Sequence, residues 1–127
     1  MAKLSAYNKR ISVSKLLKKL LEIGDVEAAA IITRDGLLIA SEMIKPVDSE
    51  TFAAMNATLF GAAETLVSEL GRGLLDRVIV EGCDAKLVAV SAGENALLVL
   101  LTDDKANIGL VLIGLEKLLP LLEKELK

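Results

Sequence analysis

Arginine is the residue type in this sequence with the clearest capacity for chemistry on a phosphate. A guanidinium group stabilises the charge that develops on a transferred γ-phosphoryl group, and Arg34, Arg72 and Arg77 are the candidates for that role. Arg34 belongs to an Arg-Asp-Gly turn between two apolar runs, and Arg72 stands between two glycines where a helix is expected to end. Arginines in such turns are usually solvated, so we predict that none of the three is catalytic.

Other reactive side chains are scarce. The sequence has no histidine and one cysteine, Cys83, which removes the usual general base, most catalytic triads and the common zinc sites. It also has no GxxxxGK[ST] loop that would cradle a nucleotide phosphate. Asp35, Asp103 and Asp104 are most simply turn or helix-capping residues, because their spacing does not resemble a calcium-binding loop. We therefore predict no catalytic residue, no metal, no cofactor and no enzymatic activity.

The composition indicates one apolar, mildly acidic domain. The 127 residues fit a single domain, and 53% of them are hydrophobic. A net charge of −3 disfavours binding to nucleic acid. The longest apolar stretch, 108–115, is far shorter than a membrane-spanning helix requires. With its single cysteine and no signal-peptide pattern, the chain is predicted to be cytoplasmic, without a membrane span.

Five apolar runs have the length of β-strands. Residues 26–33 and 37–41 flank an Asp-Gly pair, which is the strongest short signal for a hairpin. Three further runs, 76–81, 86–92 and 96–102, are separated by short turns and predict a meander. Such short connections force neighbouring strands to be antiparallel.

Three segments have helical patterns. Residues 1–11 are predicted to be a flexible tail, and Ser12 to cap a first helix that ends at Gly24. A second helix follows a break at Pro46, with Asp48 or Ser49 as its cap and Gly71 at its end. One face of this helix is traced by Phe52, Met55, Leu59, Ala62, Leu66 and Leu70. The last helix is predicted over 106–127, kinked or divided at Pro120.

The predicted order is therefore αββαβββα, an α/β (α+β) fold. Runs such as 28–32 and 97–101 are apolar at every position, which indicates a sheet covered on both faces. Three helices can supply the two covering layers.

This order and three motifs resemble the roadblock/dynein light chain 7 family. The motifs are AIITRDGLLIAS at 30–41, Gly-Arg-Gly at 71–73 leading into VIVEG at 78–82, and DKANIGLV at 104–111. The resemblance covers residues 12–127. It implies a profilin-like and longin-like domain, in which a five-stranded antiparallel sheet carries helix two on one face and helices one and three on the other.

The resemblance also implies partners. Family members pair through the edge strand after helix two, with the two second helices side by side, and commonly bind small Ras-like GTPases. The expected homodimer contacts are the edge strand and a stripe of small residues on helix two. The strand residues are Arg77, Val78, Ile79, Val80 and Glu81, and the stripe is Ala54, Thr58, Gly61, Thr65 and Ser68. Arg34 and Arg72 are candidate contacts with a GTPase.

Three functions remain open at this point. The leading one is a homodimer that binds a small GTPase and modulates its nucleotide cycle. The second is a scaffold or motor light-chain-type adaptor without effect on GTP turnover. The third, which is weaker, is a sensor that holds a small ligand under a helix.

Overall fold

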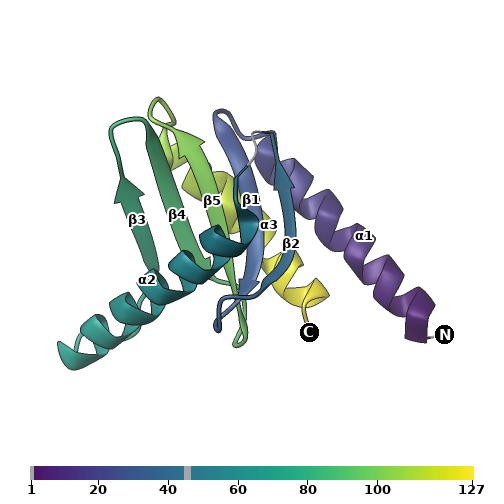
Figure 1. Cartoon of the computed structure of the whole chain (residues 1–127), viewed down its shortest axis with the longest axis horizontal. Helices are drawn as coiled ribbons and strands as arrows, with labels where there is room; N and C mark the ends of the chain where they lie inside the picture. Colours follow the sequence, from purple (N-terminus) through teal and green to yellow (C-terminus); the bar gives the residue numbers. More distant parts are fainter. Residues whose placement is uncertain (1, 45–46) are drawn as a thin grey trace.

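The computed structural model describes residues 2–44 and 47–127, and within them the elements follow the predicted order (Figure 1). Pro46, the predicted break before the second helix, lies outside the described residues. The elements are α1 (Ala2–Leu21), β1 (Val26–Thr33), β2 (Leu38–Met43), α2 (Ser49–Glu69), β3 (Arg77–Glu81), β4 (Ala85–Ser91), β5 (Ala96–Asp103) and α3 (Ile108–Glu125).

The five strands form one antiparallel sheet in the order β2-β1-β5-β4-β3. The β1–β2 hairpin and the β3–β4–β5 meander therefore lie side by side in the sheet, joined where β5 pairs with β1. In the described part of the chain, β2 and β3 are the two edge strands. The predicted five-stranded antiparallel sheet is confirmed.

Two hydrophobic cores cover the two faces of the sheet. One lies under α1 and α3 and includes Leu17, Leu20, Val111 and Leu115, none more than 2% exposed. The other lies under α2 and centres on Phe60, which packs against alternate residues of β1, β4 and β5. Figure 1 shows α2 crossing the sheet on one side, with α1 and α3 on the other. This layering confirms the prediction from apolar strands.

Local sequence explains the start of α2 and the tight hairpin. The Asp48 side chain accepts a hydrogen bond from the Thr51 backbone N–H at 3.3 Å, which satisfies one of the free donors at the start of α2. Gly36 has φ +93°, which other residues rarely adopt, in the turn between β1 and β2. Both features were expected from the sequence.

The first helix begins at Ala2, well before the predicted cap Ser12. Residues 2–11, predicted to be a tail without regular structure, therefore belong to α1. Alanine, leucine, lysine and arginine favour helix there, and no proline or glycine interrupts. Leu4, Tyr7 and Ile11 do recur at helical spacing, but roughly 130° around the helix from the buried Val13 and Leu17 at 3.6 residues per turn. These three residues therefore lie outside the apolar face that predicts the second half of the helix.

Two helix ends also differ from the prediction. The left-handed residue after α1 is Asp25, with φ +68°, and not the predicted Gly24; aspartate tolerates this region better than most residues. The last helix starts after its cap Asn107 and continues through Pro120 to Glu125 without division. Pro120 is exposed, so the carbonyl that it leaves unpaired lies on the solvent side.

Among the described helices, none is long and apolar enough to cross a membrane.

Candidate interaction surface at the free edge of the sheet

The edge strand β3 presents one unpaired side. Within residues 2–44 and 47–127, the residues of β3 pair with β4 alone, from Arg77 opposite Val90 to Glu81 opposite Lys86. Ile79 and Val80 are 42% and 40% exposed. An apolar edge strand with free backbone donors and acceptors is a template for pairing with another chain.

Side chains along β3 alternate between the two layers. Val78 packs against the core under α2, and Val80 pairs with Leu87, which packs against the same core. Ile79 pairs with Val88, which belongs to the core under α1 and α3. The exposed apolar groups of β3 therefore border both layers.

Helix α2 has three distinct faces. Ala53, Asn56, Ala57 and Phe60 are buried against the sheet. A second face is apolar and exposed along the whole helix: Met55, Leu59, Ala62, Leu66 and Leu70. The third face is the predicted small-residue stripe, and all five of its members are at least partly exposed: Ala54, Thr58, Gly61, Thr65 and Ser68.

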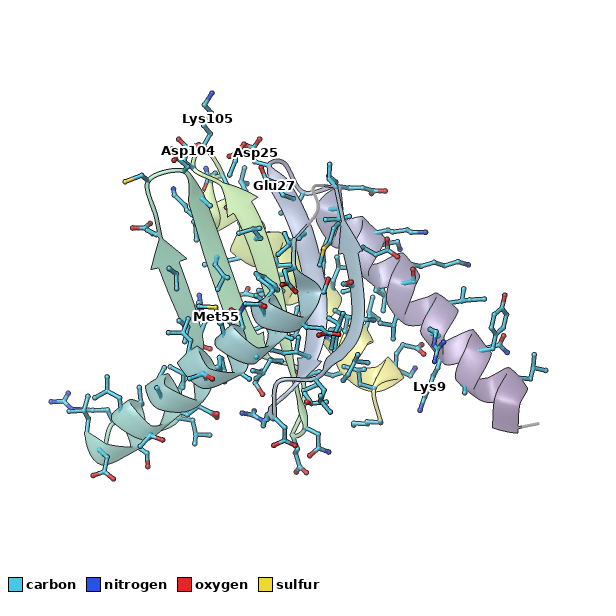
Figure 2. All side chains as sticks on the ribbon, in the orientation of Figure 1. Lys9, Asp25, Glu27, Met55, Asp104 and Lys105 are labelled. Carbon is cyan, nitrogen blue, oxygen red and sulfur yellow. The ribbon has the colours of Figure 1, made fainter. Side chains whose placement is uncertain are left out.

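The apolar face of α2 lies toward the β3 edge. Met55 lines a hollow of about 330 Å³ together with Phe52 and with Leu87 of β4. Figure 2 shows Met55 on the side of α2 that faces β4, and Figure 1 shows the C-terminal end of α2 running past β3. We call Ile79, Val80 and the five apolar residues of this face the β3–α2 surface. Val80 lies on the α2 side of the sheet and Ile79 on the side of α1 and α3, so this surface spans the edge of the sheet.

The small-residue stripe lies on the other side of α2. A Cβ atom on Gly36 would lie 3.1 Å from the Cα atom of Ala54, so this stripe begins beside the β1–β2 turn. The Thr58 hydroxyl donates to the Ala54 carbonyl oxygen at 3.0 Å, and the Thr65 hydroxyl to that of Gly61 at 3.1 Å. A Cβ atom on Gly61 would meet no neighbouring atom within 4 Å. The described residues therefore give no packing reason for glycine at this position.

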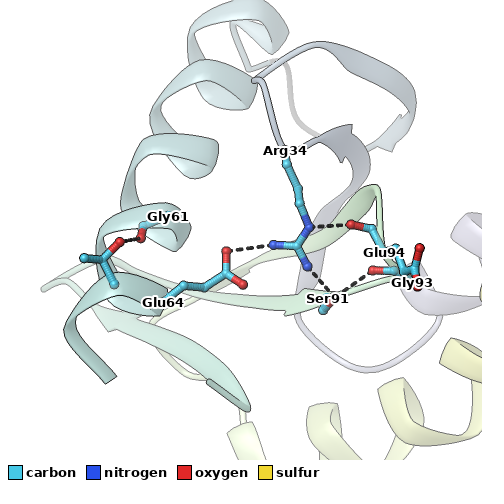
Figure 3. A network of polar contacts seen from close by, with 7 residues as sticks. Arg34, Gly61, Glu64, Ser91, Gly93 and Glu94 are labelled. Carbon is cyan, nitrogen blue, oxygen red and sulfur yellow. Dashed lines mark hydrogen bonds and ion pairs between the residues drawn. The ribbon is translucent and has the colours of Figure 1, made fainter. Parts of the chain in front are cut away.

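Arg34 is the centre of a polar network (Figure 3). Its Nε donates to the Glu94 carbonyl oxygen at 2.8 Å, Nη1 to Glu64 Oε1 at 2.7 Å, and Nη2 to Ser91 Oγ at 2.8 Å. The guanidinium also lies 5.7 Å from the ring centroid of Phe60. The network ties the β1–β2 turn to α2 and to the β4–β5 turn, and uses all three guanidinium nitrogens. No local pattern in the sequence points to these partners, which are 30 to 60 residues away.

The other two arginines are placed differently. Arg72 is exposed in the α2–β3 loop, between Gly71 at φ +65° and Gly73 at φ +90°. Arg77 Nη2 donates to Asp76 Oδ2 at 2.8 Å. The structure does not bring the three arginines together, and their contact with a partner stays a prediction. Within the described ranges, no three acidic or cysteine side chains gather where they could hold a metal ion.

Comparisons with known proteins give one matching family model and several relatives. The family model described as "Roadblock/LC7 domain" matches residues 13–102. A relative from Methanocaldococcus jannaschii, "Uncharacterized protein MJ0310", is 37% identical over 105 residues, covering 83% of this chain and 91% of the relative.

Solved structures show the same architecture. A structure described as "MglB with tetrameric arrangement" has a TM-score of 0.86 and 26% identity, with 92% of this chain and 89% of that chain covered. The gliding protein MglB from Thermus thermophilus has a TM-score of 0.85 and 26% identity, with 92% and 90% covered. Profilin II from Acanthamoeba castellanii matches with a TM-score of 0.58 and 25% identity, covering 85% of this chain and 93% of that one. The expected profilin-like fold is confirmed.

Proposed function

The chain belongs to the Roadblock/LC7 domain family, and on that premise we propose that it is a homodimeric, non-enzymatic regulator that binds a small Ras-like GTPase. The observation that carries the proposal is the β3–α2 surface, which combines an open strand edge with an exposed apolar helix face. A surface of this kind on one side of a small domain marks an interaction site. We also propose that the protein acts in the cytoplasm, for which its single cysteine, exposed and unpaired, is the support.

Self-association would use both parts of the surface. Two β3 strands pair antiparallel about a two-fold axis, which extends the sheet across both copies and satisfies the free backbone groups. The two α2 helices then lie on the same side of the extended sheet. Met55, Leu59, Leu66 and Leu70, between 38% and 66% exposed in one copy, are the side chains available for burial between them. The tetrameric arrangement of a similar MglB supports self-association in this fold.

The small-residue stripe offers an alternative contact between the helices. Small side chains permit close approach, but the stripe lies toward the β1–β2 turn and away from β3. Gly61→Leu separates the two arrangements, because the space around Gly61 is open and the substitution should leave the monomer folded. The proposal expects Gly61→Leu to keep the dimer mass.

Regulation of a GTPase would need no catalytic group from this chain. Family membership and the likeness to MglB support a role in a GTPase system. Arg34 is committed to its network, so it is poorly placed to reach a phosphate on a partner. Arg72 is exposed and remains the candidate contact. The protein would act by changing the partner's own nucleotide-binding loops, with any hydrolysis completed in the partner's active site.

The test is GTP turnover by a candidate small GTPase with and without this protein. A change in the turnover rate supports the regulator, whereas stable binding with an unchanged rate supports the scaffold or light-chain-type adaptor. Arg72→Ala is the informative variant, with Lys105→Ala, another exposed cation in a distant loop, as its control. A turnover rate that falls equally with both variants would count against a specific contact at Arg72.

A further inference from the structure

Basic residues are concentrated in helix α1. The helix contains six of the chain's 15 basic residues and no acidic residue: Lys3, Lys9, Arg10, Lys15, Lys18 and Lys19. The remaining 107 residues hold nine basic and 18 acidic residues, which is a net charge of −9. A chain with a net charge of −3 therefore carries a helix with a charge of +6.

The N-terminal half of α1 is also apolar on its outer side. Leu4 and Tyr7 are 58% and 63% exposed, and Ile11 is 37% exposed. All described side chains between residues 4 and 11 are exposed, and Figure 1 shows this half of the helix projecting beyond the sheet. Lys15 and Lys18 continue the same side of the helix, and both line a shallow hollow with Tyr7 and Ile11. The stripe is thus a row of apolar groups followed by cations.

Helix α3 adds exposed apolar groups on the same face of the sheet, although its two lysines and three glutamates give it a net charge of −1. Leu110, Ile113 and Leu121 are between 48% and 61% exposed. Lys117 and Lys124 add cations between and beyond them. We call the outer sides of α1 and α3 the α1–α3 face. Acidic residues flank the face: Glu22 is exposed directly after α1, and on α3 Glu116 is exposed while Glu123 and Glu125 are partly exposed.

We propose that the α1–α3 face binds the surface of an anionic lipid membrane. This face places exposed apolar side chains beside several lysine ammonium groups. Such helices lie in the headgroup region, with the apolar groups inserted and the lysines at the phosphates. Each basic residue near an anionic lipid surface strengthens binding about fivefold.

Two observations favour a lipid surface over a coiled-coil partner. The stripe of Leu4, Tyr7 and Ile11 spans only two turns before it becomes Lys15 and Lys18, whereas a coiled coil uses an apolar seam sustained over three or four heptads. The exposed apolar groups are also spread over two helices as a broad face. The domain outside α1 carries a net charge of −9, so repulsion from the same lipids favours α1 at the contact and orients the domain.

Tyr7 makes the proposal directly measurable, since the chain has one tyrosine and no tryptophan. The full chain is mixed with vesicles of phosphatidylcholine, either alone or with about 30 mol % phosphatidylglycerol to create the anionic surface. We expect co-sedimentation with the anionic vesicles only, and protection of Tyr7 fluorescence from acrylamide quenching. Raising the salt to about 0.5 M should release the protein, because ionic screening shortens the range of the attraction.

A matched pair of charge reversals tests the face itself. Lys18→Glu should weaken vesicle binding by on the order of tenfold. The control is Lys105→Glu, in the β5–α3 loop at the end of the sheet (Figure 2), which should change vesicle affinity by less than about twofold. Leu4→Ser with Ile11→Ser should abolish the protection of Tyr7. All these positions are exposed, and circular dichroism verifies that each variant is folded.

Several results would overturn the proposal. These are equal binding to neutral and anionic vesicles, no binding to either, or an equal loss in Lys18→Glu and Lys105→Glu. Protein that stays in the supernatant but gains mass by light scattering, in a manner that Lys18→Glu abolishes, would instead assign the face to a second copy. Solution dimer mass is measured in parallel. If the protein is a dimer but does not bind lipid, membrane binding is refuted and the proposed function is not. If the protein is a monomer that binds lipid, the proposed homodimer is refuted and membrane binding is not.

Discussion

Leu66 on the apolar face of α2 gives the sharpest test of the β3–α2 surface. The side chain is 61% exposed in one copy and is available for burial on dimerisation. Leu66→Ala removes roughly three methylene equivalents at about 0.8 kcal/mol each, so burial of the exposed 61% is worth about 1.5 kcal/mol per copy. The substitution occurs in both copies, so the dimer should lose about 3 kcal/mol, which is on the order of a 100-fold rise in Kd.

Sedimentation velocity over a range of protein concentrations measures this change. The wild type should sediment at twice the monomer mass of 13.5 kDa down to lower concentrations than Leu66→Ala. Leu110→Ala is a matched control, because Leu110 is also 61% exposed but lies on α3, on the opposite face of the sheet. An unchanged Kd in Leu66→Ala, or an equal loss in Leu110→Ala, would refute the assignment. A monomer produced by Gly61→Leu alone would move the contact to the small-residue stripe.

Three further predictions rest on the same contacts. Ile79→Lys places a charge in the free edge of β3 and should give monomer at concentrations where the wild type is dimeric, as measured by light scattering; an unchanged dimer mass contradicts pairing through this strand. Arg34→Ala should lower the free energy of unfolding by about 1 to 3 kcal/mol in urea titrations, because three hydrogen-bond acceptors lose their donor. Arg72 is exposed, so Arg72→Ala should change this free energy by less than about 0.5 kcal/mol. Gly36→Ala should lower the free energy of unfolding more than Gly71→Ala in the same titrations. Both glycines have positive φ, so alanine adds about 1 kcal/mol of backbone strain at either position. At Gly36 the added Cβ also lies 3.1 Å from the Ala54 Cα atom, whereas at Gly71 it meets no atom within 4 Å. Equal losses at the two glycines would show that this close approach is relieved without cost.

Regular local signals made most of the fold predictable. The Asp-Gly turn, the cap at Asp48 and the left-handed Gly71 each depend on residues close in sequence, and the structure has all three as expected. The start of α1 is not predictable in the same way, because Leu4, Tyr7 and Ile11 lie away from the face that buries Leu17. Periodicity detects a helix best when one face is buried throughout, and α1 is buried only over its second half.

The candidate site was less predictable, because amphipathicity does not say what covers a helix face. The series from Met55 to Leu70 was visible in the sequence, yet the sheet covers a different face that contains Ala53, Asn56 and Ala57. Alanines there let α2 approach the sheet closely, above Ala30 and Ala89. The apolar series is thereby left exposed beside β3. The rotation of α2 about its own axis decides which face meets the sheet. That rotation is set by packing between segments that are distant in the sequence.

The two proposed surfaces constrain each other through symmetry. Antiparallel pairing of two β3 strands keeps equivalent sheet faces on the same side, so a dimer presents two α1–α3 faces to one membrane. Binding through two linked faces is stronger than through one, because the second contact forms at a high effective concentration. Leu66 lies on the α2 side, remote from the lipid, so Leu66→Ala should weaken vesicle binding only through loss of the dimer. We expect the loss at protein concentrations where the variant is monomeric and the wild type dimeric, and equal binding where both are dimers. Vesicle affinity that ignores the oligomeric state would show that the two α1–α3 faces do not bind the membrane together.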